Sequence, residues 1–170
     1  MRTWLIVAML GLGACGWEHR VNKLSDVEFD HYYALKPFMS DEARKEYLKL
    51  KTEEERNKWL QDKGLWDRFY KYEEHLRKAI VNGAVQQGWT KDMVLMAWGA
   101  PYDKRVLAGR PAPKSELLLY RFEKHEDGTV IVWVPGSKTE YKAVDRFRRE
   151  VILDNDVVTE IVEKPGWTGQ

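Results

Sequence analysis

The first half of the chain has the polar and hydrophobic spacing of short helices, each preceded by a capping residue. In a capping box, a serine or threonine and the glutamate three residues later each accept a hydrogen bond from the other's backbone N–H. Ser25 with Glu28 and Thr52 with Glu55 have this spacing, and Ser40 directly precedes two acidic residues. We therefore expect three short helices, one after each of these capping residues.

The next hydrophobic pattern predicts a longer helix followed by a helix–turn–helix. Apolar residues recur near helical spacing over residues 69–85, which indicates one amphipathic helix that ends at Gly88. Thr90 is expected to cap the following helix, and Gly99 and Pro101 are expected to end it. The apolar residues of this second helix are expected to lie in the core.

The last third of the chain changes to the spacing of β-strands. Four segments have this pattern: residues 116–122, 129–134, 146–153 and 157–162. Asp127-Gly128 and residues 154–156 have the composition of tight turns between them. The sequence therefore predicts an α+β fold, with an N-terminal helical segment followed by a helix–turn–helix packed on one face of a four-stranded antiparallel sheet.

The N-terminal segment contains a motif that could indicate a nucleotide-binding protein. Residues 11–16 read GLGACG and have the G-x-G-x-x-G spacing of a dinucleotide-binding loop. That loop requires a preceding strand, a helix directly after it, and a second strand ending in an acidic residue. The residues after Gly16 lack a helical apolar stripe, and no second strand follows. We therefore do not expect this segment to bind a phosphate.

The same segment has the features of a signal peptide. Arg2 precedes an apolar run over residues 4–12, which is too short to cross a bilayer as a helix. Leu12-Gly13-Ala14-Cys15 resembles the bacterial lipobox, in which the cysteine receives a diacylglyceryl group and becomes the mature N-terminus. The resemblance implies cleavage after Ala14 and lipidation of Cys15. An ordinary signal peptide with an incidental cysteine is the alternative.

The position after the lipobox cysteine bears on the destination. In enteric-type bacteria, a residue other than aspartate there implies release to the outer membrane, and Gly16 occupies this position. The expected organisation has four parts: a signal peptide (1–14), a short tether (15–24), a helical region (25–87) and an α+β domain with an antiparallel sheet (88–170).

Composition narrows the classes of partner. The 28 basic and 27 acidic residues nearly balance, and no long run of like charge is present, so a nucleic-acid partner is not expected. The single cysteine excludes an internal disulfide and a cysteine-based zinc site. The eight tryptophans are expected mainly in the core, with room for some on a binding surface.

A stretch over about residues 38–103 resembles the GWxTD domain of bacterial envelope proteins. The resemblance rests on KTEEERNKWL, GLWDRF, GWTKD and WGAP. The motif residues are Gly88, Trp89, Asp92, Gly99 and Pro101. Lys91 stands where the family has threonine. The resemblance implies an envelope location, and the family has no established activity to carry over. From the sequence itself, these residues are expected to have a structural or interaction role, as caps and core of the helix–turn–helix.

The sequence from about residue 84 onward also resembles small outer-membrane lipoproteins of the SmpA/OmlA type, which are companions of the β-barrel assembly machinery. Their pattern is a Gly-(Met/Trp)-Thr turn, a helix, a Gly-x-Pro and an antiparallel sheet, and GWTKDMVLMAWGAP has this order. Both resemblances imply the same compartment. Trp89 and Trp98 are expected first as core residues and second as binding residues.

Three functions follow as hypotheses. The first is a lipid-anchored, non-enzymatic interaction or assembly factor at the outer membrane, held in the membrane through Cys15, with an envelope protein as partner and no cofactor. The alternative is an anchored or secreted module that binds glycan or peptidoglycan through surface aromatics. A hydrolase would need two carboxylates, or a histidine and a nucleophile, converging in one pocket, and the four histidines are scattered without a metal-ligand spacing.

Overall fold

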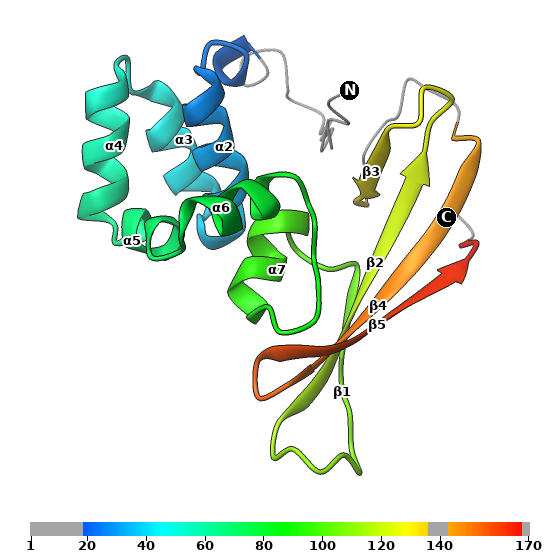
Figure 1. Cartoon of the computed structure of the whole chain (residues 1–170). Helices are drawn as coiled ribbons and strands as arrows, with labels where there is room; N and C mark the ends of the chain where they lie inside the picture. Colours follow the sequence, from blue (N-terminus) through cyan, green and yellow to red (C-terminus); the bar gives the residue numbers. More distant parts are fainter. Residues whose placement is uncertain (1–18, 136–142, 168–170) are drawn as a thin grey trace.

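The computed structural model describes residues 19–135 and 143–167, and every structural statement below concerns these residues. The predicted cleavage site at Ala14 and the predicted lipidation site at Cys15 lie outside them. Within them the chain has the predicted α+β fold, with a group of helices followed by an antiparallel sheet (Figure 1).

The helices occupy the first part of the described chain. Their bounds are Asp26–Leu35 (α2), Lys36–Phe38 (η1, a 3-10 turn), Asp41–Lys49 (α3), Glu53–Asp62 (α4), Leu65–Tyr70 (α5), Glu74–Val81 (α6) and Lys91–Trp98 (α7). Ser25 and Thr52 form the predicted capping boxes, and Ser40 and Thr90 cap α3 and α7 by accepting from backbone N–H groups. The helix starts read from the sequence are therefore confirmed.

The single long helix expected as far as Gly88 is wrong. The chain leaves the helix after Tyr70 and re-enters it at Glu74, and α6 ends before Gly83, whose φ is +67°. The carbonyl of Tyr72 accepts a hydrogen bond of 2.5 Å from Arg77 instead of continuing a helical ladder. The break turns one helix into two short ones that can pack on α2 and α7 in different directions.

Within the described residues the sheet contains five strands rather than the predicted four. They are Asp103–Val106 (β1), Ser115–Lys124 (β2), Val130–Trp133 (β3), Asp145–Asp154 (β4) and Val157–Pro165 (β5). The order is β1-β2-β4-β5, all antiparallel, and β3 pairs with the far end of the same edge of β2 that β1 uses. The strand missed from the sequence is β1, whose DKRV has one apolar residue and is mostly exposed.

The two faces of the sheet differ in burial. On β2, Leu118, Tyr120 and Phe122 are fully buried, whereas Leu117 and Leu119 on the opposite face are half-buried. The buried face packs against α7, and α7 in turn contacts the other helices, so one continuous core runs from the helices into the sheet (Figure 1). None of the described helices lies over the opposite face, which we call the open face (Figure 1).

Candidate functional site

The Gly88-Trp89 pair of the predicted motif joins the helices to the sheet. The backbone N–H of Gly88 donates to Val158 O, and the N–H of Val158 donates to Trp89 O, each at 2.8 Å. Lys91 N–H reaches Asp156 O at 2.8 Å in the tight β4–β5 turn. Gly88 has a φ of +84°, a conformation that glycine adopts without steric cost. The motif therefore attaches the segment before α7 to the β4–β5 hairpin through backbone hydrogen bonds.

The remaining motif residues also act structurally. Asp92 accepts a hydrogen bond of 2.6 Å from Arg68 Nη1, which ties α7 to α5. Gly99 ends α7 with a φ of +76°, and its carbonyl accepts from the Tyr120 hydroxyl at 3.0 Å. Pro101 follows just before β1, where the missing N–H breaks no helical bond. Trp89 is buried, as predicted from the sequence.

A network of charged side chains lies next to these backbone hydrogen bonds. Glu116 is only 3 % exposed and is ion-paired with Lys91 and Lys104. Burial raises the pKa of the Glu116 carboxyl, but the hydrogen bonds from the two lysines outweigh burial and lower that pKa below its ordinary value. Nearby, Asp154 accepts two hydrogen bonds from Arg110, at 2.9 and 2.8 Å, which lower the pKa of Asp154. Through these ion pairs, Glu116 and Asp154 stabilise the end of the sheet that contains the β4–β5 turn.

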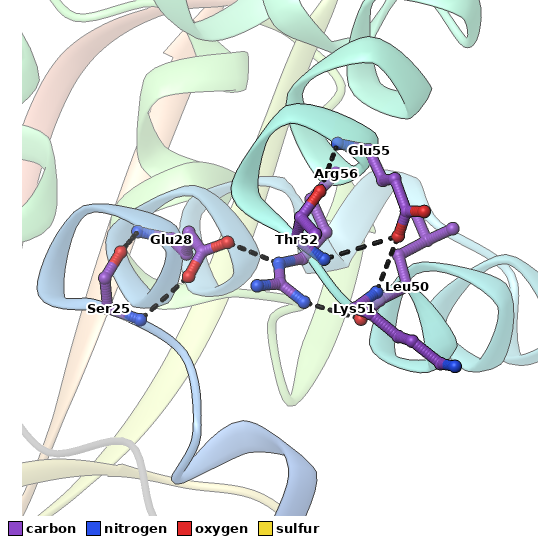
Figure 2. A network of polar contacts seen from close by, with 7 residues as sticks. All are labelled: Ser25, Glu28, Leu50, Lys51, Thr52, Glu55 and Arg56. Carbon is purple, nitrogen blue, oxygen red and sulfur yellow. Dashed lines mark hydrogen bonds and ion pairs between the residues drawn. The ribbon is translucent and has the colours of Figure 1, made fainter.

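A second buried ion pair holds the helical region together. Glu28 on α2 and Arg56 on α4 are 3 % and 8 % exposed and contact each other directly (Figure 2). Arg56 Nη1 also donates to Leu50 O at 2.6 Å, and Glu28 completes the Ser25 capping box. Burial raises the pKa of Glu28, but hydrogen bonds from Arg56 and from the Ser25 backbone outweigh it and lower that pKa. The sequence identified Glu28 only as a cap residue.

His31 is a buried titratable group in the same region. Its Nε2 lies 2.7 Å from the Tyr70 hydroxyl, and its Nδ1 is buried without a hydrogen-bond partner among the described residues. The rings of Trp66 and Phe69 meet it edge-on. Burial lowers the pKa of His31 to about 4, against the opposing charge of Glu28. The imidazole is therefore neutral at pH 7.

His31 should make folding sensitive to mild acid. A histidine in the unfolded chain has a pKa of about 6.5, whereas His31 in the folded protein has a pKa of about 4. At pH values between about 4 and 6.5, the histidine is therefore protonated in the unfolded chain but neutral in the folded protein. The contribution of neutral His31 to the free energy of unfolding is present in full above about pH 6.5 and decreases as the pH falls. At pH 4.5 we expect the free energy of unfolding to be lower by about 2–3 kcal/mol because of this residue. Urea unfolding of the wild type and of His31→Phe at pH 7 and pH 4.5 measures it. An equal acid-induced loss in both proteins would contradict this assignment.

The tryptophans do not form an exposed platform in the part of the chain that the structure describes. Trp89, Trp98 and Trp167 are buried there, and the other described tryptophans are half-buried. Glycan-binding modules stack sugar rings on exposed aromatic faces, so these positions do not favour the glycan alternative. Trp4 and Trp17 lie outside the described residues.

The described residues contain no group of three or more histidine, cysteine, aspartate or glutamate side chains placed to hold a metal ion. In the same residues, no helix has the length and apolar character needed to cross a membrane.

One surface cluster was not predicted from the sequence. On the open face, Arg121 lies among the rings of Tyr102, Trp133 and Trp167, which come from different segments of the chain. We call these four residues the Arg121 cluster. No local spacing reveals it, because strand register and the final residues of the described chain bring its members together.

Comparison with known proteins gives no assignment. No family model matches the chain, and no curated protein and no solved structure matches it significantly.

Proposed function

We propose that this chain is a lipid-anchored protein of the bacterial envelope that acts by binding another envelope protein at the periplasmic side of the outer membrane. The observation that carries the proposal is Leu12-Gly13-Ala14-Cys15 directly after an apolar run of signal-peptide length. The cysteine supplies the thiol that is alkylated, and the small residues before it give a peptidase access to the bond. Gly16 favours the outer membrane over the inner one.

Attachment in this form depends on acyl chains. Cleavage after Ala14 removes Arg2 and leaves a chain of zero formal charge, so a basic patch does not supply the membrane affinity. Several acyl chains on one cysteine give stable attachment where a single chain does not. Val21 and Leu24 already pack against the core, so the part of the tether between Cys15 and Val21 spans at most roughly 20 Å, and the folded part stays close to the membrane surface.

The interaction role is supported by the open face of the sheet. Leu117, Leu119 and Ile152 are half-buried there: Leu117 pairs with Ile152 across the strands, and Leu119 lies between Asp103 on β1 and Glu150 on β4. A face of this composition is compatible with reversible binding of another protein, because such interfaces are about as apolar as the rest of a protein surface. The partial resemblances to GWxTD-domain proteins and to SmpA/OmlA-type lipoproteins favour the same compartment.

Replacing Cys15 with serine tests the anchor. We expect the wild type to incorporate labelled palmitate and to pellet with membranes, and Cys15→Ser to lose both properties because serine has no thiol to alkylate. Gly16→Ala, which keeps the cysteine and a small neighbour, is the matched control and should behave like the wild type. A wild type that takes up no label, together with a mutant that still pellets, would show that the anchor is wrong.

The interaction role has its own measurement. Cross-linking in intact cells, followed by purification from envelope membranes, should recover the same envelope protein from wild type and from Gly16→Ala. Loss of that product in Cys15→Ser would connect binding to the anchor. Recovery of no specific product from the wild type would count against an interaction role.

A further inference from the structure

The Arg121 cluster holds a guanidinium group in an aromatic surround. Arg121 Cζ lies 3.5 Å from the ring centre of Tyr102, 5.5 Å from that of Trp133 and 5.2 Å from that of Trp167. The indoles of Trp133 and Trp167 are 4.8 Å apart, and Tyr102 is 41 % exposed. The cationic group therefore lies over the Tyr102 ring and beside the two indoles, within the range of cation–π attraction.

The neighbouring arginines differ from Arg121 in their partners. The other strand arginines each contact a carboxylate: Arg105 with Asp103, Arg146 with Glu123, Arg148 with Glu150 and Arg149 with Glu163. Among the described residues, Arg121 has no ion pair and no hydrogen bond, and its nitrogens are not among the buried unpaired atoms. Its N–H donors are thus available at the surface. Of the other strand arginines, Arg148 has the longest ion pair, at 3.8 Å, and its Nε is buried without a hydrogen-bond partner among the described residues.

The cluster is fixed in place before any partner arrives. Trp167 is buried and donates from Nε1 to Phe122 O at 2.9 Å. Gly166 N–H donates to Arg146 O at 2.8 Å, which holds the end of the described chain against β4. Because Arg121 lies among these fixed rings, little side-chain freedom remains to be lost on binding.

We propose that the Arg121 cluster binds a segment of a partner protein that presents a carboxylate beside an apolar side chain. The guanidinium offers two parallel N–H donors to the carboxylate, and Tyr102 offers an apolar surface to the neighbouring side chain. Arginine, tyrosine and tryptophan together make up the residues most enriched where binding energy concentrates. A lipid phosphate is less well matched, because the surrounding arginines are already paired and one free cation gives little attraction to an anionic membrane.

This inference deepens the interaction part of the proposed function and does not depend on the anchor. The test uses the full-length chain in detergent with two probe peptides, acetyl-Leu-Glu-Leu-amide and acetyl-Leu-Gln-Leu-amide. Binding is followed by the ¹⁵N-indole NMR signals of Trp133 and Trp167. We expect the glutamate peptide to shift both signals and to bind at least about tenfold more tightly than the glutamine peptide, because only the former forms charge-assisted hydrogen bonds.

Three variants distinguish the contribution of the Arg121 guanidinium to binding from the contribution of the surrounding surface. Arg121→Gln should bind both peptides equally weakly, whereas Arg148→Gln, which removes a paired arginine directly opposite on β4, should keep the preference for glutamate. Arg121→Lys keeps the charge without the planar fork and should retain a reduced preference, which guards against a folding defect in the first variant.

Several outcomes would overturn the inference. These are equal binding of the two peptides by the wild type, an unchanged preference in Arg121→Gln, or no shift at millimolar peptide. Indole shifts caused by phosphatidylglycerol vesicles but not by peptide would identify a lipid surface instead. Shifts that depend only on protein concentration would identify a second copy of this chain. If the anchor experiment fails while the peptide preference holds, the inference stands without the anchor.

Discussion

Arg56→Ala will lower the free energy of unfolding by about 3–5 kcal/mol. The change leaves the Glu28 carboxylate, 3 % exposed, without its ion pair and removes the hydrogen bond to Leu50 O. A buried charge that loses its partner keeps its desolvation cost and gains nothing in return. Because the pair joins α2 to α4, the loss also loosens the packing between them (Figure 2). Urea unfolding at pH 7 measures the difference from the wild type.

Two control variants isolate the buried charge in this experiment. Lys58→Ala removes an exposed ion pair with Asp62 from the same helix and should change stability by less than about 1 kcal/mol. Adding Glu28→Gln to Arg56→Ala removes the buried charge but keeps a residue that can complete the capping box, so it should recover part of the loss. An Arg56→Ala effect no larger than that of Lys58→Ala would mean that the buried pair does not stabilise the helical region.

Trp98→Ala will have an effect of similar size, about 3–5 kcal/mol. Trp98 is 2 % exposed and lies between the helices and the sheet, edge-on to Tyr120 and Phe122 at 5.2 and 5.1 Å between ring centres. Its Nε1 donates to Gly83 O at 2.9 Å. Truncation to alanine therefore opens a cavity where the helices pack against the sheet, and it leaves the buried carbonyl of Gly83 without its hydrogen bond. The measurement is again the free energy of unfolding in urea.

Trp98→Phe is the matched control for this position. It keeps most of the ring contact with β2 and loses the hydrogen bond to Gly83, so its cost should be clearly smaller than that of alanine. Equal costs for phenylalanine and alanine would assign the stabilisation to the hydrogen bond. A small cost for both would show that the joint between helices and sheet does not depend on this side chain.

The parts of the fold that depend on local interactions could be predicted from the sequence. Capping by Ser25, Ser40, Thr52 and Thr90 acts within one helical turn, so the sequence alone locates these helix starts. The turn at residues 154–156 is equally local, because Asn155 and Asp156 have the left-handed φ values of 51° and 64° that such hairpins need.

The parts that depend on distant contacts could not be predicted. The break before Glu74 does not follow from hydrophobic spacing, which continues across it, because the chain there turns to contact Arg77 and Thr90. Strand β1 is polar and exists only because β2 offers an edge to Asp103–Val106. Thr90 lies 18 residues beyond Tyr72, and the β2 residues that pair with β1 also lie on a later segment, so contacts outside the local sequence help to decide both conformations.

The same division applies to the candidate functional residues. Asp92 lies in the first turn of α7 behind the Thr90 cap, as the sequence predicted, because capping is local, whereas Gly88 does not end a helix, because α6 already ends at Val81. The setting of Arg121 depends on Tyr102, on Trp133 opposite it in register, and on Trp167 returning over the open face. Composition shows only that arginines and aromatics are plentiful.

Attachment through a lipid on Cys15 is tested most directly by mass spectrometry of the mature N-terminus. Trypsin cleavage after Arg20 yields the peptide CGWEHR from the processed chain. We predict that this peptide begins at Cys15 and has the mass of a diacylglyceryl group on its Sγ. A peptide that retains the residues before Cys15, or one that begins at Cys15 with a free thiol, would contradict the lipid anchor.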